Sequence, residues 1–258
     1  MKQKSRTEYS VMNTTVAFLA QTLAIFMGFF TRVVFTRTLS EGYVGINGLF
    51  TDILNILSLS ELGVGTAITY ALYAPIARRD IKKQQILMRM FRNFYRITAG
   101  FVLLAGLCLI PFLDILMKDR PDVNHLIIIY LLYLLNSVVS YLLIYKKTLV
   151  DAHQMNYITV MYHNGFLVLQ DILQIMVLFL TRNFILFLVI AVVCTIIGNI
   201  CMSRKADRLF PYLKEPCKEQ LPQEERHDIL RNVKAMLMHK IGLSLIHISE
   251  PTRLLSIS

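Results

Sequence analysis

The sequence predicts an all-α integral membrane protein, a bundle of six transmembrane helices. The first observation is composition, since 55% of the 258 residues are hydrophobic and only 17% are charged, whereas about a quarter are charged in a soluble chain. The second is a series of six apolar runs, each close to the roughly 20 residues that cross a bilayer as a helix. The third is that Lys and Arg gather at alternate ends of these runs.

The predicted spans follow one another with short connections. They cover residues 11–35, 44–72, 94–116, 126–145, 158–180 and 184–202, which together make a lobe of residues 1–203. Residues 73–96 interleave basic and apolar side chains, which predicts a helix lying along the membrane surface. Residues 204–234 are hydrophilic and predict a cytoplasmic connector, and residues 235–242 predict the start of a seventh helix that is cut short.

The basic residues predict the orientation of the bundle. Of the 27 Lys and Arg residues, 21 lie within residues 2–6, 78–96, 146–147 and 204–240, and five lie at the opposite ends of the spans. Cytoplasmic ends of membrane proteins carry the excess of Lys and Arg, so we expect the amino terminus in the cytoplasm. The same arrangement accounts for the net charge of +10 without a nucleic-acid partner.

The second span carries acids in an otherwise apolar run. At about 100° per residue, Asp52, Asn55 and Glu61 fall on one half of the helix, and Phe50 and Ile53 fall on the other. A charge in hydrocarbon is costly and normally faces a bundle interior or an aqueous cavity. The stripe therefore predicts one wall of a polar path through the membrane. The alternative is a polar seam that only holds helices together.

Three further side chains are candidates for this path. Arg32, near the outer end of the first span, could bind a phosphate with two parallel hydrogen bonds or could extend to the interface. Arg37 could assist it or lie in solvent. Asp171, near the middle of the fifth span, is either a relay for a proton or cation or a buried acid bonded to a neighbouring helix.

No catalytic, cofactor or metal motif is visible in the sequence. It has no glycine-rich phosphate loop, no HExxH and no nucleophile elbow. The cysteines lack metal-ligand spacing, and a disulfide framework is not expected for Cys108, Cys194, Cys201 and Cys217. We therefore expect a protein that is not an enzyme and needs no cofactor.

One stretch carries a family resemblance. Residues 32–65 read RVVFTRTLSEGYVGINGLFTDILNILSLSELGVG and resemble the amino-terminal signature of bacterial polysaccharide flippases, the Wzx-like members of the superfamily that also contains the MATE exporters. Further stretches fit the same pattern, at residues 67–77, 130–140, 145–147 and 151–157. The resemblance implies two lobes, with twelve to fourteen helices in all, around a central cavity in the bacterial cytoplasmic membrane.

The resemblance also implies substrate and partners. Such flippases move an undecaprenyl-diphosphate-linked oligosaccharide between leaflets for surface polysaccharide synthesis, so the expected partners are that substrate, membrane lipids and a carboxy-terminal lobe. The path residues would then be Arg32, Arg37, Asp52, Asn55, Glu61 and Asp171. Two alternatives remain, a MATE-like drug or cation antiporter and a membrane-embedded polysaccharide polymerase. The short external loops argue against the polymerase.

The last residues read differently from the rest of the chain. Residues 243–253, LSLIHISEPTR, resemble the translation of a common transposase sequencing adapter. They also interrupt the apolar run that begins near residue 235. We therefore expect residues 243–258 to be a non-native tail, and the preceding chain to be the amino-terminal part of a longer transporter.

Overall fold

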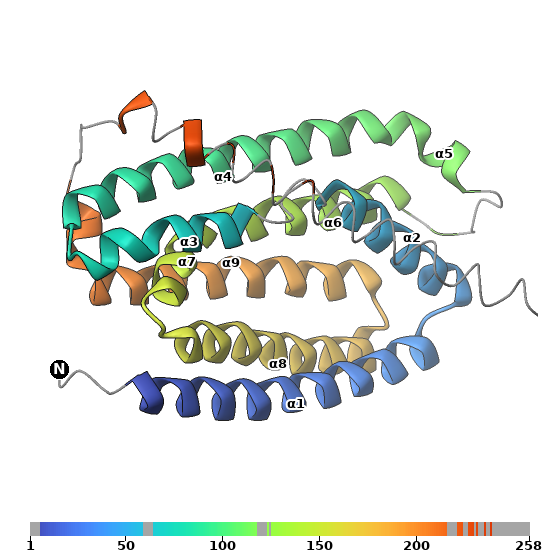
Figure 1. Ribbon diagram of the computed structural model, residues 1–258. Helices are drawn as coiled ribbons and strands as arrows, with labels where there is room; N and C mark the ends of the chain where they lie inside the picture. The colour runs from blue at the N-terminus through green and yellow to red at the C-terminus, as the bar shows by residue number, and fades with distance from the viewer. Residues whose placement is uncertain are drawn as a thin grey trace, which may run out of the picture.

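The protein is a bundle of helices that lie largely side by side (Figure 1). The computed structural model describes residues 6–58, 64–117, 123, 125–215, 221–223, 227–229, 231, 235 and 238, and every regular element within them is helical. This confirms the all-α prediction. The main helices are α1 (Arg6–Thr38), α2 (Glu41–Ser58), α3 (Val64–Ala77), α4 (Ile81–Leu109), α6 (Leu126–Tyr141), α7 (Ile144–Ala152), α8 (Asn156–Thr181) and α9 (Phe184–Leu209). Short turns of helix are η2 (Ile110–Phe112), α5 (Leu113–Leu116) and η3 (Pro211–Lys214).

Several of these helices are long and apolar enough to cross a membrane. Four pass on length and composition, Ser10–Thr38, Ile81–Phe112, Asn156–Thr181 and Phe184–Leu209. The pair α6 and α7, bent by 40°, makes a fifth if it is one span. The chain is therefore consistent with a multi-pass membrane protein. The predicted number of six is not confirmed, because the structure describes residues 41–58 and 64–77 as two helices where one span was expected.

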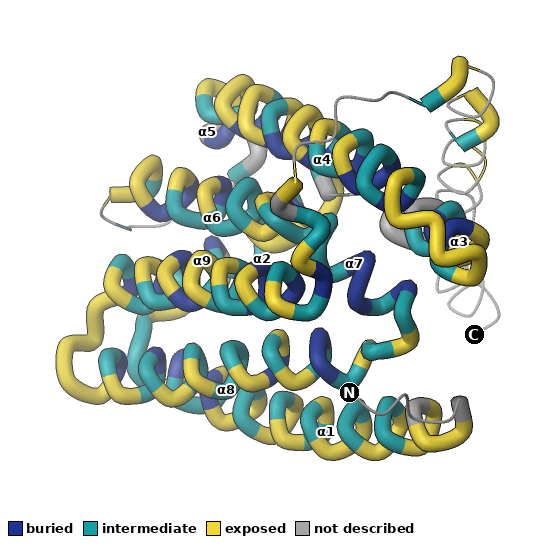
Figure 2. Tube along the Cα trace, turned by 90° about the vertical axis from the view of Figure 1, so that its left-hand side faces the viewer, coloured by how far each residue is buried: buried dark blue, intermediate teal, exposed yellow. Residues whose placement is uncertain are grey.

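The outer surface of the bundle is strongly apolar. On α1, Phe18 is 70% exposed and Leu19 is 63% exposed, and Leu180 at the far end of α8 is 77% exposed. Figure 2 shows exposed residues along the outer side of α1, away from α8. Apolar patches of this extent are rare on soluble monomers and mark surfaces that contact lipid or another protein. The exposed faces are therefore suited to the acyl chains of a bilayer.

Residues 73–96 do not form the separate surface helix that the sequence predicted. Instead α3 ends at Ala77, Arg79 adopts a left-handed conformation with φ 56°, and Asp80 begins the next helix. The Asp80 carboxylate accepts a hydrogen bond from the Lys83 backbone N–H at 2.9 Å, which caps α4. From Ile81 the helix continues without a break to Leu109, a length of about 43 Å at 1.5 Å per residue.

The alternation of basic and apolar residues has a different cause from the one expected. Met88, Phe91 and Tyr95 are buried in the bundle core, whereas Arg89 and Arg96 are exposed. The pattern is that of a helix with one buried face. The sequence pattern is the same whether the buried face contacts a membrane surface or other helices.

The core is closely packed where α4 contacts α6. The Tyr130 hydroxyl donates to the Gly106 carbonyl at 2.8 Å, and a Cβ atom at Gly106 would lie only 2.3 Å from Leu134 Cδ1. Phe50 of α2 packs edge-on against Tyr130, with ring centroids 5.1 Å apart. Glycine at position 106 therefore permits a close approach of helices that any side chain would obstruct.

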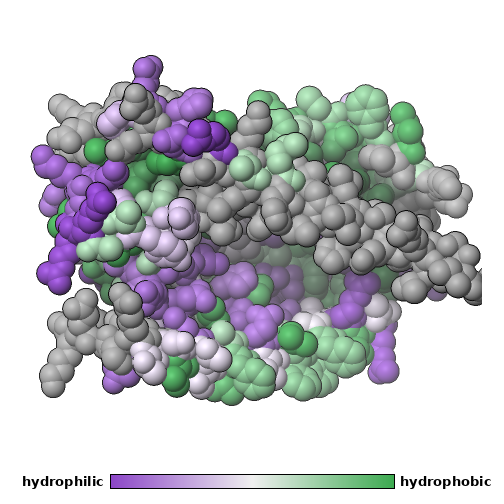
Figure 3. Space-filling model, viewed as in Figure 1, coloured by the Kyte–Doolittle hydropathy of each residue, from purple (hydrophilic) through white to green (hydrophobic). Residues whose placement is uncertain are grey.

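One end of the bundle gathers the basic groups. The start of α1, the α3–α4 turn and the α7–α8 connection all lie at this end (Figure 1), and Figure 3 shows hydrophilic atoms over the same end. This basic end carries Arg78, Arg79, Lys82, Lys83, Lys146, Lys147, Arg204, Lys205 and Arg208, whereas Arg37 and Arg182 lie at the opposite end. These cations, which the sequence assigned to one side of the membrane, thus share one end, whereas Arg89, Arg92 and Arg96, assigned to the same side, lie 8, 11 and 15 residues beyond the start of α4. The side itself stays a prediction.

Candidate functional site

A polar groove lies within the bundle and is the candidate functional site. Two adjoining cavities form it, of about 240 and 480 Å³, and both are lined by Lys147, Thr159 and His163. The smaller lies among α6, α7, α8 and α9, and the larger among α1, α7 and α8. Figure 3 shows hydrophilic surface running inward from the basic end, above the paler surface of α1. Because the cavities share residues, we treat them as one feature, the polar groove.

The groove reaches from the basic end toward the middle of the membrane helices. Lys147 belongs to α7 at the basic end, and Gln170 lies 14 residues after the start of α8, or about 21 Å along the helix. Asn199 of α9 lines the same cavity as Gln170. Polar groups are therefore spread along a considerable depth of the bundle, as a path for a polar molecule requires.

Two adjacent lysines of α7 differ in their partners. Lys146 Nζ lies 2.8 Å from Asp207 Oδ2 of α9, an ion pair whose side chains are only 14% and 20% exposed. Lys147 is half-buried and lines both cavities. Within the described part of the chain it forms no ion pair, and Asp151, the acid that interacts with it electrostatically, accepts a hydrogen bond from Thr159 at 2.6 Å. Lys147 therefore presents its charge to the groove.

Amides and hydroxyls line the groove together with apolar side chains such as Phe166, Leu167 and Ile25. Asn164 donates to Gln21 across the α1–α8 contact at 3.4 Å, and Asn199 donates to the Val139 carbonyl at 3.0 Å. Each carboxamide retains further hydrogen-bonding capacity after these contacts. An ammonium group suits an anion, and amides suit hydroxyl-rich molecules, so the groove can hold a ligand that combines both.

The residues that the sequence predicted for the path lie elsewhere in the described structure. Arg32 and Arg37 are exposed on α1, and the Arg32 guanidinium carbon lies 5.7 Å from the centroid of the Phe35 ring. Asp52 and Asn55 are exposed on α2, outside the buried stripe formed by Ile46, Phe50 and Leu54. None of the four lines the two cavities of the polar groove. Glu61 lies outside the described residues.

Asp171 has a partner on the neighbouring helix. The Thr31 hydroxyl of α1 lies 3.0 Å from Asp171 Oδ1 and 3.0 Å from the Met27 carbonyl. Asp171 is half-buried and does not line the polar groove. The contact matches the interpretation of an acid bonded to an adjacent helix, while its part in a relay stays a prediction.

The sequence analysis missed the residues that line the groove. Lys147 lies on α7, whereas Thr159, His163 and Gln170 follow one another at spacings of four and seven residues on one face of α8. The signal that could have pointed to Lys147 is the adjacent pair of lysines at the end of a span. The sequence does not tell which of the two has an acidic partner.

Comparison of the chain with known protein families, with curated proteins and with solved structures finds no match.

Proposed function

We propose that this chain forms one wall of a transmembrane path for a lipid-linked oligosaccharide, of the kind that bacteria move across the cytoplasmic membrane for surface polysaccharide synthesis. The observation that carries the proposal is Lys147, a half-buried cation without an ion pair among the described residues, set in a polar groove between membrane-length helices. A second lobe facing this groove would complete the path.

The chemistry of the groove supports this substrate class. A diphosphate linkage is strongly anionic and would interact favourably with Lys147 at the basic end. The sugar hydroxyls would exchange hydrogen bonds with Gln170 and Asn199 deeper in the bundle. The lipid tail would remain among the exposed apolar side chains of α1 and α8, so only the polar head needs the path.

The positive charge of Lys147 also separates a flippase from the alternative of a drug or cation antiporter. A drug or cation antiporter would carry a positively charged substrate past Lys147, which costs electrostatic free energy that Asp151, an acid outside the groove lining, offsets only in part. Asp171, the acid nearest mid-membrane on α8, is engaged with Thr31 and lies outside the groove. The groove therefore favours an anionic substrate over a cationic one.

Binding to the purified chain in nanodiscs of neutral lipid tests the proposal. A polyprenyl-diphosphate-linked oligosaccharide should bind, and Lys147→Gln should weaken that binding about tenfold, because a charge-assisted hydrogen bond contributes about 1.5–3 kcal/mol. The matched control is Lys205→Gln, which removes the same charge at the same end but outside the groove. Equal affinities for the two variants would contradict the proposal, as would tighter binding of an organic cation.

A further inference from the structure

A second cavity lies at the turn between α3 and α4, away from the polar groove. It has a volume of about 310 Å³ and is enclosed by the end of α3, the start of α4 and the short segment at residues 228–229. We call it the hairpin pocket. Its size falls at the lower end of the roughly 300–1,000 Å³ typical of small-molecule sites. It shares no lining residue with the polar groove.

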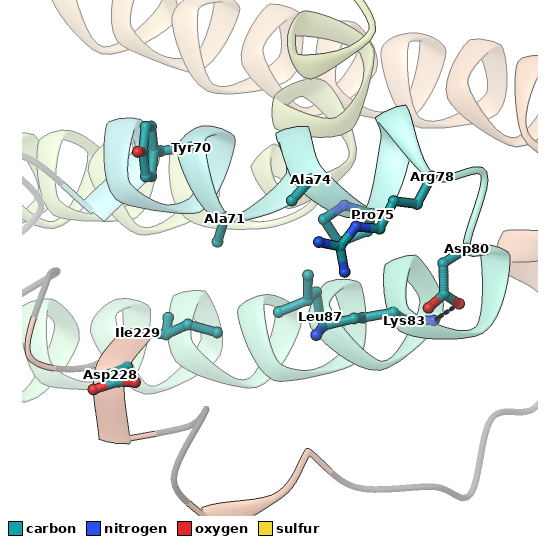
Figure 4. A pocket seen from close by; sticks show the side chains of 10 residues that line it. All are labelled: Tyr70, Ala71, Ala74, Pro75, Arg78, Asp80, Lys83, Leu87, Asp228 and Ile229. Carbon is teal, nitrogen blue, oxygen red and sulfur yellow. Dashed lines mark hydrogen bonds between the residues drawn. The ribbon is translucent and has the colours of Figure 1, made fainter.

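Two cations reach into the hairpin pocket. Figure 4 shows the Arg78 guanidinium and the Lys83 ammonium group pointing into the space between α3 and α4. Their convergence follows from the tight turn, because left-handed Arg79 and the Asp80 cap bring position 78 of one helix above position 83 of the next. Among the described residues, the Arg78 guanidinium forms no hydrogen bond or ion pair.

The two acids of the pocket are already engaged. Asp80 caps α4 through the Lys83 backbone N–H at 2.9 Å. Asp228 forms an ion pair with Arg231 at 3.1 Å. The two positive charges of Arg78 and Lys83 equal in number the two negative charges of Asp80 and Asp228. Arg231 adds a further positive charge beside Asp228. Lys83 already makes a further interaction within the chain, so an anion would meet the Arg78 guanidinium first, with Lys83 as a second positive charge beside it and with acids whose charges are partly compensated.

The rest of the lining is apolar and small. Ala71 and Ala74 on α3 face Leu87 on α4 (Figure 4), and Tyr70 stands at the rim with 66% of its surface exposed. Small side chains leave room beside the cations for a hydrocarbon chain. Exposed tyrosines are typical of the membrane–water interface. Charge at one end and apolar surface at the other match an amphiphile better than a free ion.

We infer that the hairpin pocket binds the phosphodiester headgroup of an anionic membrane lipid, with Arg78 and Lys83 on the phosphate and the adjoining acyl chain against Ala71, Ala74 and Leu87. Guanidinium geometry matches phosphate oxygens, and basic pockets between membrane helices at their cytoplasmic ends are suited to such headgroups. The site is independent of the proposed transport function, because it requires neither the polar groove nor its substrate.

Native mass spectrometry of the full chain in nanodiscs tests the inference. The lipid is phosphatidylcholine with a titrated fraction of phosphatidylglycerol, and the measured quantity is the bound phosphatidylglycerol per chain. The wild type should retain one tightly bound molecule. Arg78→Gln with Lys83→Gln should weaken its retention at least tenfold. The matched control is Arg79→Gln with Lys82→Gln, which removes the same charge from the same turn but from residues outside the pocket.

A second variant tests the shape of the pocket without changing charge. Ala74→Leu, at an exposed position that lines the cavity, should also reduce phosphatidylglycerol retention while leaving the thermal unfolding of the chain unchanged in phosphatidylcholine alone. Equal loss in both charge variants would overturn the inference in favour of general surface attraction. Equal retention of water-soluble glycerol phosphate in phosphatidylcholine nanodiscs would overturn the lipid assignment in favour of a free phosphate.

Discussion

The adjacent residues Lys146 and Lys147 have the same side chain but different surroundings. Both are lysines of one helix, yet Lys146 lies 2.8 Å from Asp207 and Lys147 lines the polar groove. The ion pair joins α7 to the end of α9 at the basic end of the bundle. We infer that Lys146 stabilises the helix packing that holds Lys147 in place.

Removing Lys146 should therefore destabilise the fold. Lys146→Met would leave Asp207 partly buried without its cation, which should cost about 1–3 kcal/mol and lower the Tm in detergent. The control is Arg231→Met, which breaks the exposed pair with Asp228, whose side chains are 69% and 60% exposed, and should change stability by less than about 1 kcal/mol. Equal Tm values for the two variants would show that the Lys146 pair has no structural role.

At the scale of the elements, the contact between α4 and α6 depends on one glycine. Leu134 fills the space where a Cβ of Gly106 would lie, and it is only 1% exposed, so it has little room to move. Gly100 belongs to the same helix and has no atom within 4 Å of its own ideal Cβ position. The two glycines provide a matched pair in one helix.

Alanine at the two positions should have opposite effects. Gly106→Ala forces α4 and α6 apart or displaces Leu134, and overpacking of this kind costs about 1–3 kcal/mol. Gly100→Ala should stabilise α4 by about 0.5–1 kcal/mol, because alanine favours a helix interior. Thermal unfolding in detergent compares them directly. A Gly106→Ala variant as stable as Gly100→Ala would contradict the close packing described for these helices.

At the scale of the whole molecule, the basic end predicts orientation. On a cysteine-free background, Arg204→Cys should react with a membrane-impermeant reagent only after permeabilisation, because cytoplasmic ends carry the excess of Lys and Arg. Arg182→Cys, at the opposite end and equally exposed, should react in intact cells. The reverse labelling pattern would invert the topology and move the entrance of the polar groove to the other side.

The sequence predicts where most of the helices lie along the chain, but it does not predict how they pack against one another. The apolar runs at residues 11–35, 158–180 and 184–202 correspond to α1, α8 and α9, because the length and hydropathy of a run can be read from the sequence alone. The pattern at residues 73–96 was misassigned because an amphipathic helix looks the same against lipid or against a core. The groove residues were missed for a related reason. Lys147 and Gln170 line one cavity only because α7 and α8 pack together, and the sequence does not specify that packing.

Photolabelling tests whether the polar groove holds the glycan of a lipid-linked oligosaccharide, as we propose. The chain is incubated with a lipid-linked oligosaccharide that carries a photoreactive group on its terminal sugar, and labelled residues are identified by mass spectrometry. We expect adducts at groove residues such as Gln170 and Asn199, and excess unmodified substrate should prevent their formation. Labelling confined to lipid-facing residues such as Ile172, which is 44% exposed two positions beyond Gln170, would contradict it.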